Sequence, residues 1–186
     1  MAYVKWFFLL IIGIPFELFA KVLSPVLACF VQANGWLPDW LWMFQTPDNT
    51  CDGDAGHRER WPRDGVIWIW LRRTAWLFRN SAYGFNFYVL GVKYLPTDAV
   101  TIEGDPGVGD TSGISGLCKW RLERDGKLYA WQIYYVRHYR IFGRWKCVRF
   151  GAGWKLWGDI VADPQCPHWL YFHPIKGSGL EGKAKQ

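Results

Sequence analysis

The first part of the chain is apolar over a length that few folds can use. Apart from Lys5, Glu17 and Lys21, residues 4–31 carry no charged side chain. Because about twenty apolar residues in a helix cross the hydrocarbon core of a bilayer, the sequence predicts a transmembrane anchor in residues 1–33. Glu17 and Lys21 are four residues apart, so on a helix they share a face and can neutralise each other.

Other interpretations of this segment stay open. Pro15 and Pro25 indicate a kink or a pair of short helices in place of one straight rod. A cleaved signal peptide needs an uninterrupted apolar centre, which the charged residues spoil. A lipoprotein signal, with Cys29 as the lipidated residue, and a buried helix pair are the remaining alternatives. Lys5 and the amino terminus favour an N-terminus inside and a body outside the membrane.

Charge is distributed unevenly along the chain. The total is +6, of which residues 1–33 carry +1 and residues 34–65 carry −3, which leaves +8 for the remainder. Such a body suits anionic lipid or nucleic acid, and an ordinary solvated basic surface is the alternative. The 14 Trp, 12 Phe and 9 Tyr side chains fit a core, a sugar-binding face or a membrane surface, since such rings collect where dry and wet regions meet.

Residues 34–65 are predicted to connect the anchor to the body. Trp36, Trp40 and Trp42 recur within a few residues, which is typical of an aromatic belt at a membrane interface. A hydrophobic turn packed on the domain is the alternative. Lipid is therefore an expected partner of this connector.

A helix is predicted over residues 66–79, with Asp64 as its N-cap. Two arginines interrupt its apolar run, so a second spanning helix is not expected. A basic amphipathic helix suits anionic lipid or packs on its own sheet, and both possibilities stay open. Its arginines Arg72, Arg73 and Arg79 are candidate membrane-interface residues. One face collects Ile67, Trp70, Leu71, Thr74, Leu77 and Phe78, and the opposite face collects Arg72, Arg73, Trp76 and Arg79.

The rest of the body alternates as strands do. Asp125-Gly126 supplies a tight turn between two alternating runs and predicts a hairpin. Strands are also expected in residues 84–92, around residue 100, in one or two pieces over residues 143–161, and at residues 168–175. The predicted fold class is α+β: a membrane helix, then an α+β domain over residues 66–176 with one amphipathic helix packed on an antiparallel, aromatic-rich meander. Residues 177–186 are expected to form a flexible tail.

The stretch TPDNTCDGDAGHRERWP at residues 46–62 has the spacing of a calcium loop. Alternate oxygens surround a hard cation, Gly53 permits the sharp turn, and a bidentate glutamate closes the shell. Pro47 and Pro62 make the flanking helices of an EF-hand hard to build, so an acidic connector is the alternative. The candidate ligands are Asp48, Thr50, Asp52, Asp54 and Glu59.

Other site patterns are weak. Cys166, His168 and His173 would form a zinc site only if Cys118 or Cys147 folded beside them. The four cysteines after Cys29 permit two disulfides without requiring them. The glycines of GDPGVGDT resemble a phosphate loop, but an aspartate stands where a lysine is needed. Arginines interleaved with rings in residues 134–150 admit a nucleic-acid groove, although a half-buried strand gives the same pattern. No pattern nominates a catalytic pair.

Three stretches carry a family resemblance: FQTPDNTCDGDAGHRERWP, WLFRNSAYGFN and FGAGWKLWGD. With them, the chain resembles small, uncharacterised, membrane-anchored proteins encoded by tailed bacteriophages. The resemblance implies a viral protein of the bacterial envelope or the virion, and brings no catalytic residues. The expected function is a membrane-anchored binding protein acting on the inner membrane of an infected host, with an envelope protein as a possible partner. A structural virion protein and a cation-dependent envelope hydrolase are the alternatives.

Overall fold

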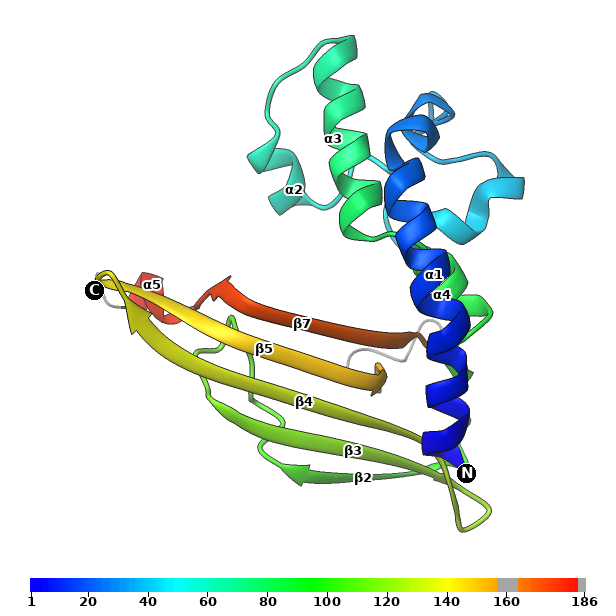
Figure 1. The fold of residues 1–186 in the computed structure, drawn as a ribbon, viewed down its shortest axis with the longest axis vertical. Coiled ribbons are helices and arrows are strands. Elements are labelled where there is room, and N and C mark those ends of the chain that lie inside the picture. The colour runs from blue at the N-terminus through cyan, green and yellow to red at the C-terminus, as the bar shows by residue number, and fades with distance from the viewer. Residues whose placement is uncertain (157–163, 184–186) are drawn as a thin grey trace. The chain divides into compact units, whose positions relative to one another are not determined.

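The structure, a computed structural model, describes residues 1–156 and 164–183. It divides into two compact units (Figure 1). The sheet unit comprises Met1–Trp6 and Val92–Gln186, and the helical unit comprises Phe7–Gly91. The chain therefore begins in the sheet unit, leaves it along the first helix, and returns to it after the helical unit.

The first helix, α1, spans Ala2–Cys29 (Figure 1). It runs through both prolines, so the expected alternative of two short helices is wrong. Pro25 has no N–H to donate to the carbonyl of Lys21 one turn earlier, and the hydroxyl of Ser24 takes over by donating to that oxygen at 2.8 Å. The ion pair expected between Lys21 and Glu17 is confirmed, with 2.8 Å between Nζ and Oε1.

Short helices follow α1 in the helical unit. The amphipathic helix expected at residues 66–79 is confirmed with the same bounds, but its N-cap is Gly65, with φ 110° and no side-chain capping bond. The proposed cap at Asp64 is therefore wrong. The helices are η1 (Asp39–Phe44), α2 (Ala55–Arg60), α3 (Val66–Arg79) and α4 (Tyr83–Tyr88).

The strand expected at residues 84–92 is wrong, because α4 occupies most of it. The aromatic residues of YGFNFY alternate as they do in a strand, but so short a run does not distinguish the two-residue period of a strand from the 3.6-residue period of a helix. Long-range packing decides: a Cβ on Gly84 would collide with the carbonyl of Trp42 in η1, so glycine lets the two helices approach closely. Extended pairing begins later, at β1 (Val92–Lys93).

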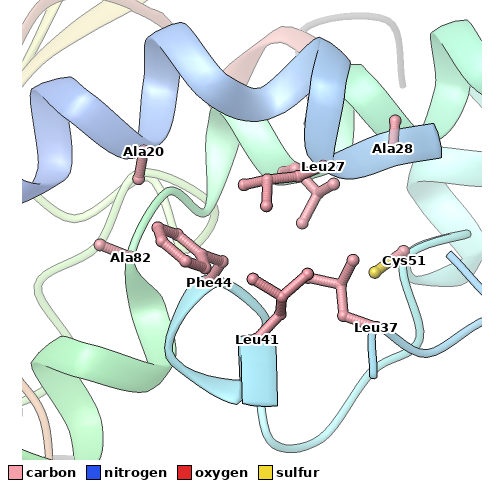
Figure 2. Close-up of a cluster of buried hydrophobic side chains, with 9 residues drawn as sticks. Ala20, Leu27, Ala28, Leu37, Leu41, Phe44, Cys51 and Ala82 are labelled. Atoms are coloured by element: carbon pink, nitrogen blue, oxygen red, sulfur yellow. The ribbon is translucent and has the colours of Figure 1, made fainter. Parts of the chain in front are cut away.

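The core of the helical unit joins segments that are distant in sequence. Phe16 of α1 lies with its ring centroid 5.4 Å from that of Phe44 and 4.2 Å from that of Phe85. Figure 2 shows the buried side chains converging from α1, η1 and the loops. The buried members are Ala20, Leu27, Ala28, Leu37, Leu41, Phe44, Cys51, Leu77 and Ala82.

The predicted antiparallel meander is confirmed. Its strands lie in the order β2-β3-β4-β5-β7 (Figure 1), and β1 pairs separately with β6 (Gln165–Cys166). The long strands of the hairpins come from alternating sequence that favours a half-buried sheet. The bounds are β2 Ala99–Gly104, β3 Gly116–Arg124, β4 Lys127–Ile141, β5 Arg144–Trp154 and β7 His168–Gly177.

Two hairpin turns of this sheet have the same backbone form. Asp125 and Gly126 have φ 51° and 69° between β3 and β4, as predicted. Phe142 and Gly143 have φ 48° and 77° between β4 and β5. Two successive residues with positive φ form a type I′ turn, for which Asn, Asp and Gly are preferred. Phe142 is thus the unusual residue, because it occupies the position that Asp125 holds in the other turn.

The register gives the sheet a covered and an open face. Tyr134, Gly151 and Tyr171 lie side by side across β4, β5 and β7 on the covered face. The open face is defined by two neighbouring rows, one of Ile133, Ala152 and Leu170 and the other of Tyr135, Phe150 and Phe172.

Residues 177–183 are folded, in contrast to the flexible tail expected there. Ser178 is buried, and the N–H of Gly179 donates to the carbonyl of Asp110 at 2.7 Å. A short helix, α5 (Leu180–Lys183), follows. A Cβ on Gly179 would overlap the backbone of Thr111, so a glycine permits this close approach. Residues 184–186 of the expected tail lie outside the described residues.

Candidate functional site

One side of α1 is a continuous apolar surface exposed to solvent. Its side chains lie three, four or seven residues apart, which places them on one face of the helix. A helix on the surface of a soluble domain presents polar residues there. The stripe consists of Val4, Phe8, Ile11, Leu18, Val22 and Val26, each between 54 and 78% exposed.

The other side of α1 packs within the helical unit. Ala20, Ser24 and Leu27 are buried there at helical spacing, and Trp70 of α3 donates its indole N–H to the carbonyl of Pro25 at 2.9 Å. Among residues 1–156 and 164–183, α1 is the one helix long and apolar enough to cross a membrane, judged by length and composition. The apolar stripe is thus not needed for packing within the described protein.

The first turn of α1 is fixed to the open face of the sheet. Trp6 donates its indole N–H to the carbonyl of Gly153 at 3.0 Å, and its ring lies 5.0 Å from that of Trp131. Tyr3 adds a second contact with Trp131, also at 5.0 Å. The Lys5 ammonium lies near the ring of Tyr129. The amino terminus therefore packs on the sheet of the body, and the expected orientation across a membrane stays a prediction.

The candidate calcium ligands are engaged elsewhere or lie apart. Asp54 caps α2 by accepting the N–H of His57 at 2.7 Å. Asp48 and Glu59 are exposed. Throughout the part of the chain that the structure describes, no three His, Cys, Asp or Glu side chains gather closely enough to hold a metal ion. Calcium binding stays a prediction from spacing, without support from this geometry; Thr50 is half-buried.

Asp52 joins the expected calcium loop to α3. Its Oδ1 accepts bonds from Arg73 Nε at 3.0 Å and Arg72 Nη2 at 3.1 Å, and its Oδ2 accepts a second bond from Arg73. Burial opposes ionisation of Asp52, but the two guanidinium groups outweigh it and lower the pKa of the carboxyl below its ordinary value. Two of the three arginines expected at a membrane interface are thus bound to a carboxylate, while Arg79 is exposed beside the ring of Trp76.

The faces expected for α3 are partly wrong. Trp76, assigned to the polar side, is buried, whereas Ile67 and Phe78, assigned to the packed side, are exposed. The cause is His57, which lies under α3 with its ring 5.1 Å from that of Trp76 and its Nε2 2.9 Å from the carbonyl of Arg72. The buried side of α3 therefore faces His57 of α2, which precedes it in the chain.

The three tryptophans of the expected aromatic belt are not equivalent. Trp40 is 66% exposed and its ring meets that of Phe30 edge to face at 6.1 Å. Trp42 is exposed next to Tyr88, and Trp36 is half-buried. Trp40 and Trp42 keep the exposure that an interfacial role needs.

The zinc interpretation has no geometric support. His168 is buried between the rings of Trp6 and Trp154, and burial lowers its pKa to about 4. None of the five cysteines forms a disulfide within the described residues. Cys51 belongs to the core of the helical unit, and burial raises the pKa of its thiol to about 12.

A charged cluster that the sequence did not indicate lies on the covered face. Asp110 accepts an ion-pair contact from Arg149 at 3.3 Å and another from Lys176, and the hydroxyl of Tyr134 donates to it at 3.4 Å. Burial opposes ionisation, but Lys176 and Arg149 outweigh it and lower the pKa of the Asp110 carboxyl. The Arg149 guanidinium also lies over the Tyr171 ring at 4.5 Å.

A serine and a histidine meet beside this cluster. His138 Nδ1 lies 2.7 Å from Ser178 Oγ, and its Nε2 lies 3.1 Å from the carbonyl of Gly109. With Nε2 protonated, the hydroxyl donates to Nδ1, as in a nucleophilic pair. Ser178 is buried, however, and also accepts the N–H of Leu180. The pair therefore ties α5 to the sheet.

A model of a family of unknown function, DUF7338, matches residues 1–179. The chain belongs to this family. No match was found among curated proteins or among solved structures. In this member of DUF7338, the matched residues include α1, the helical unit and all the strands, so the exposed helix and the sheet fall within the extent of the family.

Proposed function

We propose that this protein is a membrane-associated binding protein, held to a bilayer by α1 and presenting its sheet unit to a partner. The observation that carries the proposal is the exposed apolar stripe of α1. Transfer of a large apolar side chain out of water contributes about 1.5–3 kcal/mol, so the stripe as a whole supplies on the order of 10 kcal/mol. Lipid is the environment that recovers this free energy.

The path of the chain determines how α1 meets the membrane. Trp6 is bonded to Gly153 in the sheet, and the chain re-enters the sheet unit at Val92. A full crossing by α1 would require a second crossing before Val92. α3 has 14 residues and two arginines bound to Asp52, which makes it too short and too polar to span. We therefore propose that α1 enters one leaflet, with both of its ends on the side of the sheet.

The setting we propose is the bacterial envelope during phage infection. Support for it comes from the resemblance of residues 44–62, 76–86 and 150–159 to proteins encoded by tailed bacteriophages. An envelope protein is the partner that a membrane-held binding domain would meet there. The basic body, with a net +8 after residue 65, suits attachment to an anionic bilayer.

The test compares membrane attachment of the full chain and two variants. Ile11→Lys with Leu18→Lys places two charges on the apolar stripe, and Val100→Lys places one charge on an exposed apolar residue of β2 as the control. We expect the stripe variant to leave the membrane fraction and the control to remain in it. Equal attachment of both variants, each with an unchanged melting temperature, would contradict the proposal.

A membrane-impermeant maleimide determines on which side of the membrane the C-terminal end of α1 and the sheet lie. Cys29 is the exposed cysteine of the chain and lies at the end of α1, while the other four are buried. Asp125→Cys adds a thiol at a turn of the sheet. We expect both thiols to react from the same side of sealed vesicles. Reaction from opposite sides would show that α1 crosses the bilayer and that the Trp6 contact does not form there.

A further inference from the structure

The turn between β4 and β5 carries an aromatic side chain that the fold does not use. Phe142 is 96% exposed and has φ 48°, a conformation that bulky residues rarely adopt. At the equivalent position of the other type I′ turn stands Asp125, which tolerates this conformation. Residues held in disfavoured backbone conformations cluster at functional sites, which points to a role for this exposed ring outside the fold.

Three of the five cations around this turn have no partner carboxylate among the described residues. Residues 137–149 contain four arginines and a lysine and no acidic residue. The ion pairs recorded here involve Lys146 with Glu181 and Arg149 with Asp110. Across the described ranges 1–156 and 164–183, no carboxylate pairs with Arg137, Arg140 or Arg144, all of which are exposed.

More apolar surface lies beside the turn. Ile141 is exposed next to Phe142, and Ile175 is 68% exposed. Tyr139 places Ile175 near the turn, because its hydroxyl donates to the carbonyl of the adjacent Pro174 at 3.0 Å. Phe172, in the open face of the sheet, is 62% exposed. The apolar surface thus extends from the turn onto the open face, on which the first turn of α1 also packs.

We propose that this turn, residues 140–144, is a docking site for the surface of an anionic lipid bilayer. Phe142 and Ile141 enter the headgroup region, where aromatic side chains are favoured, and the three arginines contact lipid phosphates, for which guanidinium is suited. The inference rests on the proposed membrane association and adds a second attachment point to it. The first turn of α1 contacts Trp131, and the docking turn begins beside Ile141. These two residues are ten positions apart on β4, about 33 Å, so the first turn of α1 and the docking turn can reach one bilayer when β4 lies along its surface.

The test reads the turn directly in the full chain. Phe142→Cys in a Cys29→Ser background is labelled with a polarity-sensitive dye and mixed with vesicles of phosphatidylcholine alone or with phosphatidylglycerol. Thr111→Cys is the control, because Thr111 is exposed next to Asp110 on the covered face. We expect a blue shift at position 142 with anionic vesicles, none at position 111, and a smaller shift at high salt.

The other outcomes overturn the inference. Cosedimentation of the chain with anionic vesicles and an unchanged dye at position 142 would leave the proposed function standing and remove the docking site. A blue shift without vesicles that grows with protein concentration would assign the turn to a second copy of the chain. Failure of the unlabelled protein to cosediment at all would remove both proposals.

Matched substitutions separate binding from folding. Phe142→Asn keeps a residue that accepts positive φ, so we expect an unchanged or higher melting temperature and weaker binding to anionic vesicles. Arg140→Gln with Arg144→Gln should reduce the preference for anionic over neutral vesicles by about thirtyfold. Asp125→Asn makes the equivalent change at the other turn and should leave binding unchanged. Unaltered binding by the Phe142 and arginine variants would contradict the proposed contacts.

Discussion

The indole N–H of Trp6 donates a hydrogen bond to the carbonyl of Gly153 at 3.0 Å, across 147 positions of the sequence. This bond fixes the first turn of α1 to the sheet. Trp6→Phe keeps a ring but removes the donor, and we expect a loss of about 1 kcal/mol in the free energy of unfolding. Urea denaturation of the full chain measures it, and an unchanged midpoint would show that the contact does not form.

Gly153 itself admits no side chain. Its φ is 110°, and an added Cβ would overlap the carbonyl of Trp131. We expect Gly153→Ala to destabilise the sheet by roughly 2–4 kcal/mol. Gly143→Ala is the control, since it has φ 77° and open space around it, and should cost about 1 kcal/mol. Equal losses for the two variants, read from melting temperatures, would show that the overlap is relieved easily.

Acidification should weaken the sheet unit through His168. Burial lowers its pKa from 6.5 to about 4, so between these values the unfolded chain binds the proton and the folded chain does not. The contribution of His168 to the free energy of unfolding is therefore fully present above pH 6.5. It decreases as pH drops toward 4, by about 3 kcal/mol in total. His168→Gln should flatten that slope in urea midpoints measured from pH 7 to 4. A slope that persists in the variant would assign it to other groups.

Ser24 and Pro25 should be energetically coupled. Ser24→Ala leaves the carbonyl of Lys21 without the hydroxyl that replaces the missing proline donor, at a cost of about 1 kcal/mol. In a Pro25→Ala background, the new N–H can donate to that carbonyl, and Ser24→Ala should cost little. A double-mutant cycle followed by helical circular dichroism in detergent gives the coupling. Additive losses would mean that the helix does not need the hydroxyl.

Asp52 should stabilise the helical unit through its arginines. Asp52→Asn leaves Arg72 and Arg73 without their carboxylate, at a cost of roughly 2 kcal/mol at neutral pH. Because the folded pKa lies below 3.8, the advantage of the native residue is present above that value and disappears as pH falls below it. Calcium should leave the melting temperature of the native chain unchanged, since arginines hold both Asp52 oxygens. A rise with calcium, reversed by a chelator, would support the spacing-based site.

Strong local patterns predicted much of the fold. The period of residues 66–79 and the turn at Asp125-Gly126 determined an element and a hairpin without long-range information, and both are confirmed. The same reasoning failed at residues 83–88, where the packing of Gly84 against η1 decides for a helix. It also failed for the faces of α3, because a histidine from the preceding helix determines which side is buried.

The sites depend on contacts that no local pattern contains. In the sequence, Asp110 stands only as the residue that rules out a phosphate loop, and its pairing with Arg149 and Lys176 depends on the register of β5 and β7. Ser178 lay in a segment whose composition resembles a tail, yet it reaches His138 forty positions earlier. Phe142 gave a signal that could have been used: a phenylalanine before glycine between two alternating runs is an unusual hairpin turn.

The contact between Trp6 and Gly153 also sets an order of events during synthesis. At a ribosomal rate of 5–20 residues per second, the 147 positions between the two residues take on the order of ten seconds to produce. For most of that interval α1 is already synthesised, while the sheet that receives its first turn is still incomplete. If α1 enters a bilayer as proposed, it can do so before the sheet is complete, and the finished sheet then closes onto a helix that is already in lipid.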